Sequence, residues 1–333
     1  MKLFDTVQTL NAAFGPSGDE AGVASVIRSL AEPFVDEITT DVMGNLICHK
    51  KGSGPKVMFA AHMDSLGFVV THIEKDGYLR VAALGGISAA RVLHTPIRFK
   101  NGVKGLVSAD AGVSIDKITV DDLFLDIGAA SREEAEQLVC PGDVAIYHTP
   151  VMENNGVIIS PYLDNRISCA VQLLAMVKLG QSKNDLYFVF TVQEELGLRG
   201  AKTAAYAIDP DYGIVLDVTG SSDTPKVKHT DSSVQGKGAA IKVMDHSVIC
   251  DPEVVNLLEL LAVEKHIDHQ KTVKRTGGTD AGAMQPTRSG VKVSGICVPC
   301  RYTHSPAECI REKDAMCCVD LVCAFAEATL EKE

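Results

Sequence analysis

The segment Val57-Met58-Phe59-Ala60-Ala61-His62-Met63-Asp64 sets the architecture of this 333-residue chain. Its five successive apolar residues predict a strand that is buried on both faces, as strands are in parallel sheets covered by helices. The histidine and the aspartate lie just beyond the end of this strand. Open α/β sheets bind their ligands outside the carboxyl ends of the strands, so His62 and Asp64 are the first candidates for a functional site.

Strand patterns alternate with helix patterns over most of the chain. Apolar runs predict further strands at residues 185–192, 213–216 and 291–298. Apolar residues at helical spacing predict helices within residues 5–32 and at 167–177, 200–207, 252–264 and 312–330. Residues 41–46 read as a hairpin with Gly44 in its turn. We therefore predict an α/β fold, with a mixed, mostly parallel sheet sandwiched by helices.

The pattern changes between residues 68 and 160. Short β-like segments recur there at 67–73, 79–83, 96–99, 103–107 and 143–147, with one short helix at 131–137. This predicts a small β-rich domain inserted into a larger domain made of residues 1–67 and 161–333. Strand edges in such an insertion are normally paired or covered, which favours contacts between copies of the chain.

Composition excludes several classes of protein. The net charge is −11 and no basic cluster of the kind that binds nucleic acid appears, so we expect no nucleic-acid partner. No apolar stretch approaches the roughly 20 residues of a membrane span. The N-terminus shows no signal-peptide pattern, which predicts a cytoplasmic protein with reduced cysteines. Cys297 and Cys300 form a C-x-x-C, but no second pair at suitable spacing makes it a structural zinc site.

Residues with metal-binding side chains follow several of the predicted strands. The candidates are His62, Asp64, Asp164, Glu194, Glu195, Asp217 and His304. Taken singly, most have an ordinary explanation, such as a helix cap for Asp164. The adjacent carboxylates of Glu194 and Glu195 indicate more, because they repel each other unless a cation offsets their charge.

Together these residues predict a site for two divalent ions. Two histidines and several carboxylates suit Zn²⁺, Co²⁺ or Mn²⁺. Two such ions about 3.5–4 Å apart can share a bridging carboxylate and activate a water. The cluster 266–269, with two histidines around Asp268, competes for this role, but no apolar residues frame it as a concave site, so we interpret it as a surface feature.

Five separated blocks of sequence resemble the TET or glutamyl aminopeptidases, dinuclear metallo-aminopeptidases of which some once carried the name endoglucanase. The blocks are Ala61-His62-Met63-Asp64-Ser65-Leu66-Gly67-Phe68, Leu163-Asp164-Asn165-Arg166, Gln193-Glu194-Glu195-Leu196-Gly197-Leu198-Arg199-Gly200-Ala201, Gly277-Gly278-Thr279-Asp280-Ala281 and Arg301-Tyr302-Thr303-His304-Ser305-Pro306-Ala307-Glu308. They occur in the family's order and span nearly the whole chain. Thr303, Cys297 and Cys300 depart from residues common in the family, but none of them is a ligand.

The resemblance implies a role for each candidate. Asp164 would bridge the two ions. His62 and Asp217 would complete one site, and Glu195 and His304 the other. Glu194 would be the general base, and Asp64 would orient His62. The fold implied is that of the zinc exopeptidases.

The resemblance also implies a substrate and an assembly. The substrate would be a peptide with a free N-terminus, which the carboxylate cluster attracts as an ammonium group. Residues 68–160 would mediate oligomer contacts, with dimers assembling into a dodecamer. Gly277 to Asp280 would form a loop at the substrate end of the site.

Two other functions remain open at this point. A related two-metal carboxypeptidase or deacylase would need a cation to clamp the substrate carboxylate, and Arg166 and Arg301 are the motif-borne candidates. The other is a carbohydrate-processing or non-catalytic binding protein. A glycosidase would use a pair of carboxylates without metal, and chelation would leave its activity intact. The preferred side chain and the physiological metal are not encoded in any pattern that we recognise.

Overall fold

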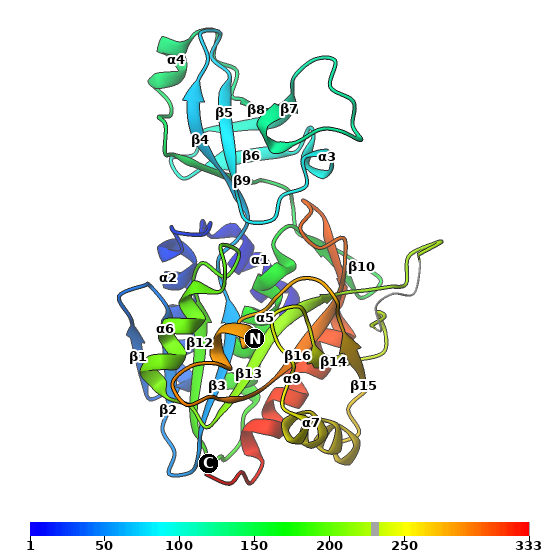
Figure 1. The fold of residues 1–333 in the computed structure, drawn as a ribbon. Helices are drawn as coiled ribbons and strands as arrows, with labels where there is room; N and C mark the ends of the chain where they lie inside the picture. The colour runs from blue at the N-terminus through cyan, green and yellow to red at the C-terminus, as the bar shows by residue number, and fades with distance from the viewer. Residues whose placement is uncertain (228–232, 333) are drawn as a thin grey trace.

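The computed structural model describes residues 1–227 and 233–332, which form a large α/β body and a smaller β-barrel above it (Figure 1). In the described residues the α/β body contains one eleven-stranded sheet. Its main path runs in the order β1 (Glu37–Thr40), β2 (Leu46–Lys50), β12 (Asp185–Thr191), β3 (Lys56–His62), β13 (Tyr212–Gly220), β16 (Lys292–Arg301), β17 (Glu308–Arg311), β11 (Val157–Ser160) and β10 (Met152–Asn154). A side branch adds β14 (Ala239–Met244), which pairs with β16, and β15 (His269–Val273).

The centre of this sheet is parallel and its flanks are antiparallel. β12, β3, β13 and β16 are successive parallel neighbours, whereas β1, β2, β17, β11 and β10 pair antiparallel. Residues Val57 to Ala61 of β3 are completely buried, as their unbroken apolar character predicts. The predicted mixed, mostly parallel sheet is therefore confirmed at its core.

Helices cover both faces of the sheet. One layer contains α1 (Leu3–Ala12), α5 (Leu163–Lys178), α7 (Pro252–Glu264) and α9 (Glu312–Glu327). α6 (Arg199–Ile208) and the short α8 (Ala281–Met284) pack against the other face, and α2 (Ala21–Ala31), followed by a 3₁₀ turn at Glu32–Phe34, lies beside α1, α5 and β2. No helix of the described residues is long and apolar enough to cross a membrane.

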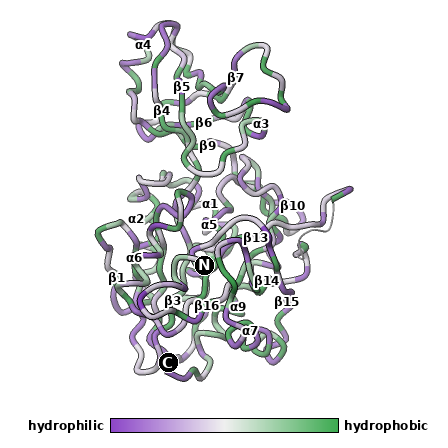
Figure 2. Tube along the Cα trace, in the orientation of Figure 1, coloured by the Kyte–Doolittle hydropathy of each residue, from purple (hydrophilic) through white to green (hydrophobic). Residues whose placement is uncertain are grey.

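The barrel closes on itself in the order β4 (Gly67–Ile73), β5 (Leu79–Leu84), β8 (Leu123–Asp126), β7 (Lys104–Ala109), β6 (Pro96–Phe99) and β9 (Val144–Tyr147). It has its own hydrophobic core and three short helical segments, α3 (Ala89–Val92), Val120–Asp122 and α4 (Arg132–Glu136). In Figure 2 the hydrophilic colour lies on its outer parts, at α4 and in the loop after β7.

Several sequence-based boundaries differ from the structure. The barrel strands end at Tyr147, because β10 and β11 pair within the large sheet instead. Closure of the barrel also removes the free strand edges that we expected there. β8 was not predicted. β13 continues past Asp217 to Gly220 because its ladder with β16 continues, so a polar residue does not end this strand.

Candidate metal centre

All seven candidate residues lie together at the carboxyl ends of the central strands. His62 ends β3, and Glu194 and Glu195 follow the neighbouring parallel strand β12. Asp217 lies within β13, on the other side of β3. Asp164 is in the first turn of α5, after the left-handed residue Tyr162, and its peptide bond to the next residue is cis. His304 comes from the loop between β16 and β17.

The carboxylate of Asp164 lies between the two histidines. Its Oδ1 is 3.1 Å from Nε2 of His62, and its Oδ2 is 3.4 Å from Nε2 of His304. Glu195 faces His304 across 3.6 Å, from Oε2 to Nε2. Asp217 faces His62 across 3.9 Å, from Oδ1 to Nε2. The arrangement offers one shared carboxylate with a histidine and a second carboxylate on each side.

These groups line a cavity of about 760 Å³. Candidate ligand atoms lie within 4.8 Å of one another in two overlapping triplets, His62–Asp164–Glu195 and His62–Glu194–Asp217. Gly277, Gly278 and Thr279 also line the cavity, as expected for the loop at its substrate end.

Burial raises the pKa of three carboxyl groups in the centre. Desolvation, followed by the charge of Asp164, raises the pKa of Glu195 to about 7. Desolvation also raises the pKa of Asp217 to about 8, against the opposing charge of His62. The pKa of Glu194 is raised well above its usual range, again mainly by burial. Packing this many carboxylates together is unfavourable unless protons or cations offset their charge.

The histidines have the opposite effect on Asp164. Burial disfavours the ionised form of Asp164, but hydrogen bonds with His304 and His62 outweigh it and hold the pKa of Asp164 below its usual range. The same contact with Asp164 raises the pKa of His304 to about 10. In the metal-free centre, protons on the histidines and on the buried carboxyl groups therefore offset the negative charge of the carboxylates.

The donor set fits divalent metal ions. Oε1 of Glu195 is buried without a hydrogen-bond partner among the described residues, so it has lone pairs to offer. Imidazole nitrogens combined with carboxylate oxygens suit Zn²⁺, Co²⁺ and Mn²⁺ better than soft or purely oxygen-binding ions. The described residues thus contain a donor set of histidines and carboxylates that suits a divalent metal ion.

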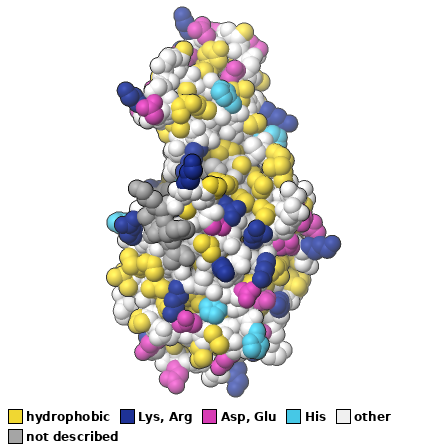
Figure 3. Space-filling model, turned by 90° about the vertical axis from the view of Figure 1, so that its right-hand side faces the viewer, with side chains coloured by type: hydrophobic (Ala, Val, Ile, Leu, Met, Phe, Trp, Pro, Cys, Tyr) yellow, Lys and Arg dark blue, Asp and Glu magenta, His cyan; other side chains and the backbone are white. Residues whose placement is uncertain are grey.

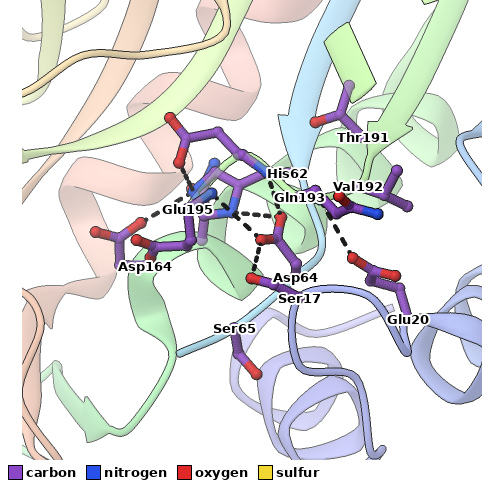
Figure 4. A network of polar contacts seen from close by, with 12 residues as sticks. Ser17, Glu20, His62, Asp64, Ser65, Asp164, Thr191, Val192, Gln193 and Glu195 are labelled. Atoms are coloured by element: carbon purple, nitrogen blue, oxygen red, sulfur yellow. Dashed lines mark hydrogen bonds and ion pairs between the residues drawn. The ribbon is translucent and has the colours of Figure 1, made fainter. Parts of the chain in front are cut away.

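Asp64 organises the turn that carries the two glutamates (Figure 4). It is completely buried and lies 3.4 Å from Nδ1 of His62, measured from its Oδ1. The backbone N–H groups of Glu194 and Glu195 donate to its two oxygens at 3.0 and 3.3 Å. The hydroxyl of Ser17 donates to Oδ2 at 2.6 Å. One carboxylate thus contacts the ring of His62 and accepts the backbone N–H groups of both glutamates.

Two further acids support the centre and were not among the sequence-based candidates. Glu308 accepts hydrogen bonds from the backbone N–H groups of Asp164 and His304, both at 2.7 Å. Glu20 accepts from the backbone N–H of Gln193 at 3.2 Å, just before the two glutamates. Glu308 lies within a quoted motif and Glu20 directly precedes α2, but their partners are distant in sequence, so no local pattern marks these roles.

Neither arginine proposed as a carboxylate clamp lines the cavity. Arg166 is completely buried and donates to the carbonyls of Leu10 at 2.7 Å and Gly15 at 3.0 Å. Arg301 makes two hydrogen bonds to Asp223, at 2.7 and 2.6 Å. Both guanidinium groups are engaged in contacts within the fold, so neither supports a carboxylate clamp of the kind that a carboxypeptidase needs.

The competing metal clusters do not form a comparable site. His266 and Asp268 are exposed, and Asp268 pairs with Lys313 at 2.6 Å. Cys297 and Cys300 are completely buried within β16. Among the residues that the structure describes, the metal-capable groupings are those around His62.

Comparison with known proteins agrees with this geometry. Residues 44–321 match the family model of the M42 glutamyl aminopeptidases. A putative aminopeptidase of Acetivibrio thermocellus is 44% identical over 307 residues, which cover 92% of this chain and 93% of that protein. An aminopeptidase from the archaeon Desulfurococcus kamchatkensis superposes with a TM-score of 0.94 at 35% identity, covering 98% of this chain and 95% of that one. A TET1 peptidase of Pyrococcus horikoshii, which can assemble into a tetrahedron or a large octahedral shell, superposes with a TM-score of 0.87 at 30% identity, covering 98% and 100%.

Proposed function

Because the chain belongs to the M42 glutamyl aminopeptidase family and is thus an aminopeptidase, we propose that it uses two divalent metal ions to hydrolyse the first peptide bond of its substrates. The observation that carries this proposal is the position of Asp164, whose two oxygens face one histidine each at 3.1 and 3.4 Å. A carboxylate shared in this way is suited to bridging two ions.

We assign the ligands from this arrangement. His62 and Asp217 would hold one ion, Glu195 and His304 would hold the other, and Asp164 would be shared by both. When bound, Zn²⁺, Co²⁺ or Mn²⁺ ions at these positions would lower the pKa of a water between them and polarise the scissile carbonyl. Asp64 orients His62 through Nδ1, so that Nε2 points into the cavity.

Glu194 is the general base. Its Oε2 lies 3.8 Å from Nε2 of His62, at the edge of the ligand cluster. An ionised carboxylate at this place can accept a proton and give it up again. Glu194 takes a proton from the attacking water and then returns it to the leaving amine.

The carboxylates of the cavity select the amino end of the substrate. Asp164, Glu194, Glu195 and Asp217 all line it, and two divalent ions would balance their four charges. Selection therefore depends on carboxylate oxygens, which accept hydrogen bonds from a substrate ammonium and have no proton to donate to a terminal carboxylate. The carboxypeptidase alternative would need a cation clamp, and Arg166 and Arg301 are engaged elsewhere. Of the cations that line the cavity with Lys274, Lys242 pairs with Asp245 and Arg91 donates to the carbonyl of Thr303.

Two short peptides test the direction of cleavage. One has a free amine and an amidated C-terminus, and the other has the same sequence with an acetylated amine and a free C-terminus. We expect release of the first residue from the amidated peptide and almost no cleavage of the acetylated one. Release of the last residue from the acetylated peptide would make the enzyme a carboxypeptidase.

Removal of metal tests the mechanism. Dialysis against a chelator should abolish cleavage, and refilling with Zn²⁺, Co²⁺ or Mn²⁺ should restore it at about two ions per chain, the stoichiometry of a two-metal site. Activity that survives complete removal of metal would exclude the two-metal mechanism and revive the metal-free alternative, which includes carbohydrate processing.

We also propose the cellular and quaternary setting. The enzyme acts in the cytoplasm on peptides with a free N-terminus. The α/β body, which includes β10 and β11, forms the catalytic domain, and the inserted barrel from β4 to β9 brings copies together as dimers that build a dodecamer. The assembly of the P. horikoshii relative into closed shells supports this proposal.

A further inference from the structure

One wall of the active-site cavity comes from the inserted barrel. Gly86, Ser88 and Arg91 line the cavity together with the ligand residues of the α/β body. These three residues follow β5 and run into α3, at the side of the barrel that faces the α/β body (Figure 1). Figure 3 shows that the molecule narrows between the two bodies.

The backbone of this wall reaches the second histidine. The carbonyl oxygen of Gly86 lies 2.9 Å from Nδ1 of His304. A carbonyl can only accept a hydrogen bond, so Nδ1 carries a proton and Nε2 is the ring nitrogen left to bind an ion. Nε2 points toward Asp164 and Glu195, at 3.4 and 3.6 Å. Once Nε2 loses its own proton, the ring has the tautomer that a metal ligand requires, fixed by the hydrogen bond of Nδ1.

The fit between this wall and the centre leaves no room for a side chain. A Cβ at Gly86 would lie 2.8 Å from Nδ1 of His304. A Cβ at Gly85 would lie 2.3 Å from Cδ2 of Leu66 and 3.1 Å from Cβ of Glu195. Gly85 also has a φ of +85°, which favours glycine. Two adjacent glycines therefore allow the barrel to approach both ligands of one proposed metal.

The loop that carries His304 needs outside support. His304 has a φ of 60° and Tyr302 has a φ of 63°, a left-handed conformation that is uncommon for residues other than glycine. Nη1 of Arg91 donates to the carbonyl of Thr303 at 3.3 Å. Where the chain leaves the barrel, the hydroxyl of Thr149 donates to the carbonyl of Pro306 at 2.9 Å. Helix α3 of the barrel and the segment that leaves the barrel thus both hold this loop.

We propose that the barrel, besides being an inserted domain, positions a ligand of the metal centre. The carbonyl of Gly86 is a positioning group that fixes the ring and tautomer of His304, and thereby sets the affinity of the ion held by His304 and Glu195. This inference rests on the two-metal function proposed above. It assigns control of one of the two ions to residues outside the α/β body.

The test compares Gly86→Ala with Ala90→Ser. Each variant adds one heavy atom to the same segment, but Ala90 is exposed and does not line the cavity. Metal-free protein is titrated with Co²⁺ against a competing chelator, and the visible absorption of bound Co²⁺ is recorded. Loss of the partner that orients a ligating histidine typically weakens metal binding 10–100-fold. We expect this loss for one of two ions in Gly86→Ala, with a changed Co²⁺ spectrum, and no loss in Ala90→Ser.

Melting of the metal-free proteins checks that the variants fold. If Gly86→Ala does not fold, Thr149→Val takes its place, because it removes one hydrogen bond to the His304 loop and keeps the side-chain shape. It should weaken the same ion by a smaller factor and leave the other unchanged. Two ions bound with unaltered affinity in a folded Gly86→Ala, or in Thr149→Val where that replaces it, would overturn the inference. A wild-type protein that binds fewer than two ions would instead overturn the proposed two-metal function.

Discussion

Glu194 and Glu195 are adjacent in sequence but face different histidines. Oε2 of Glu195 lies 3.6 Å from His304, and Oε2 of Glu194 lies 3.8 Å from His62. Asp64 binds the backbone of both, so the two side chains are held apart at fixed positions. Substitution of each glutamate should therefore have a different effect.

We expect Glu194→Gln to remove proton transfer and retain the metal. The value of kcat should fall by about 10²–10⁴, the usual contribution of a general base. Elemental analysis should still find about two ions per chain, as expected for an intact two-metal site. Glu195→Gln is the matched comparison, and it should lose metal as well as activity. If Glu194→Gln loses metal while Glu195→Gln keeps it, the two roles are exchanged.

The metal-free protein should lose stability as the pH rises. Burial raises the pKa values of Glu195 and Asp217 from 4.5 and 3.8 to about 7 and about 8. Between the ordinary and the raised value of each group, the folded state holds a proton that the unfolded state has lost. Contact with Asp164 raises the pKa of His304 from 6.5 to about 10, which acts in the same direction at higher pH. Stability falls wherever the folded state binds the extra protons.

Thermal melting between pH 5 and pH 9 measures this dependence. The melting temperature of metal-free wild type should fall more steeply than that of Asp217→Asn, which cannot ionise. Saturating Zn²⁺ should flatten the slope, because ligands must lose their protons to bind metal. An identical slope in metal-free wild type and Asp217→Asn would remove Asp217 as a source of the dependence.

At the scale of elements, a buried arginine joins the helix of Asp164 to the N-terminal segment. Arg166 lies two residues after Asp164 in α5 and donates to the carbonyls of Leu10 and Gly15. Gly15 in turn accepts a hydrogen bond from the backbone N–H of Ser65, beside Asp64. Three segments that are far apart in sequence are thus fixed to one another beneath the metal centre.

Arg166→Met should destabilise the fold. It would leave two carbonyls without their donor, and each buried unsatisfied group costs about 1–3 kcal/mol. Urea unfolding of the metal-free proteins measures the loss. The exposed Arg199 provides a control, since Arg199→Met should change stability by no more than about 0.5 kcal/mol. Equal stability of the two variants would show that the Arg166 contacts contribute little.

The sequence predicted those elements that local patterns specify. The unbroken apolar run of β3 predicted its burial, and β4 and β6 were placed at the residues where they occur. The prediction that β13 ends before Asp217 was wrong, because this strand pairs with β16 through residue 220. The contacts of Ser17, Glu308 and Gly86 could not be foreseen, since each depends on how distant segments pack.

At the scale of the whole molecule, the barrel presents exposed apolar side chains. Among the described residues these include Tyr78, Leu106, Ile115 and Leu138. The face drawn in Figure 3 otherwise mixes cationic and anionic side chains. Because the barrel is closed, association through it would use side chains and not free strand edges.

Sedimentation of the intact protein tests the proposed assembly. We expect a species far heavier than the 35.5 kDa of one chain, as befits a relative of a peptidase that forms closed shells. The ionic strength should be varied, because salt weakens contacts between charged groups and leaves apolar ones in place. A monodisperse monomer at micromolar concentration would contradict the assembly.

The distances along the chain between the groups of the centre have a consequence for its biosynthesis. His62 and Asp164 are 102 positions apart, and Gly86 and His304 are 218 apart. During translation the N-terminal parts of a chain emerge and begin to fold first. His304 and the Glu308 carboxylate that holds the backbone of Asp164 emerge more than 200 residues after His62. A nascent chain on the ribosome therefore lacks a complete centre, and it cannot trim neighbouring nascent chains until residue 308 has emerged.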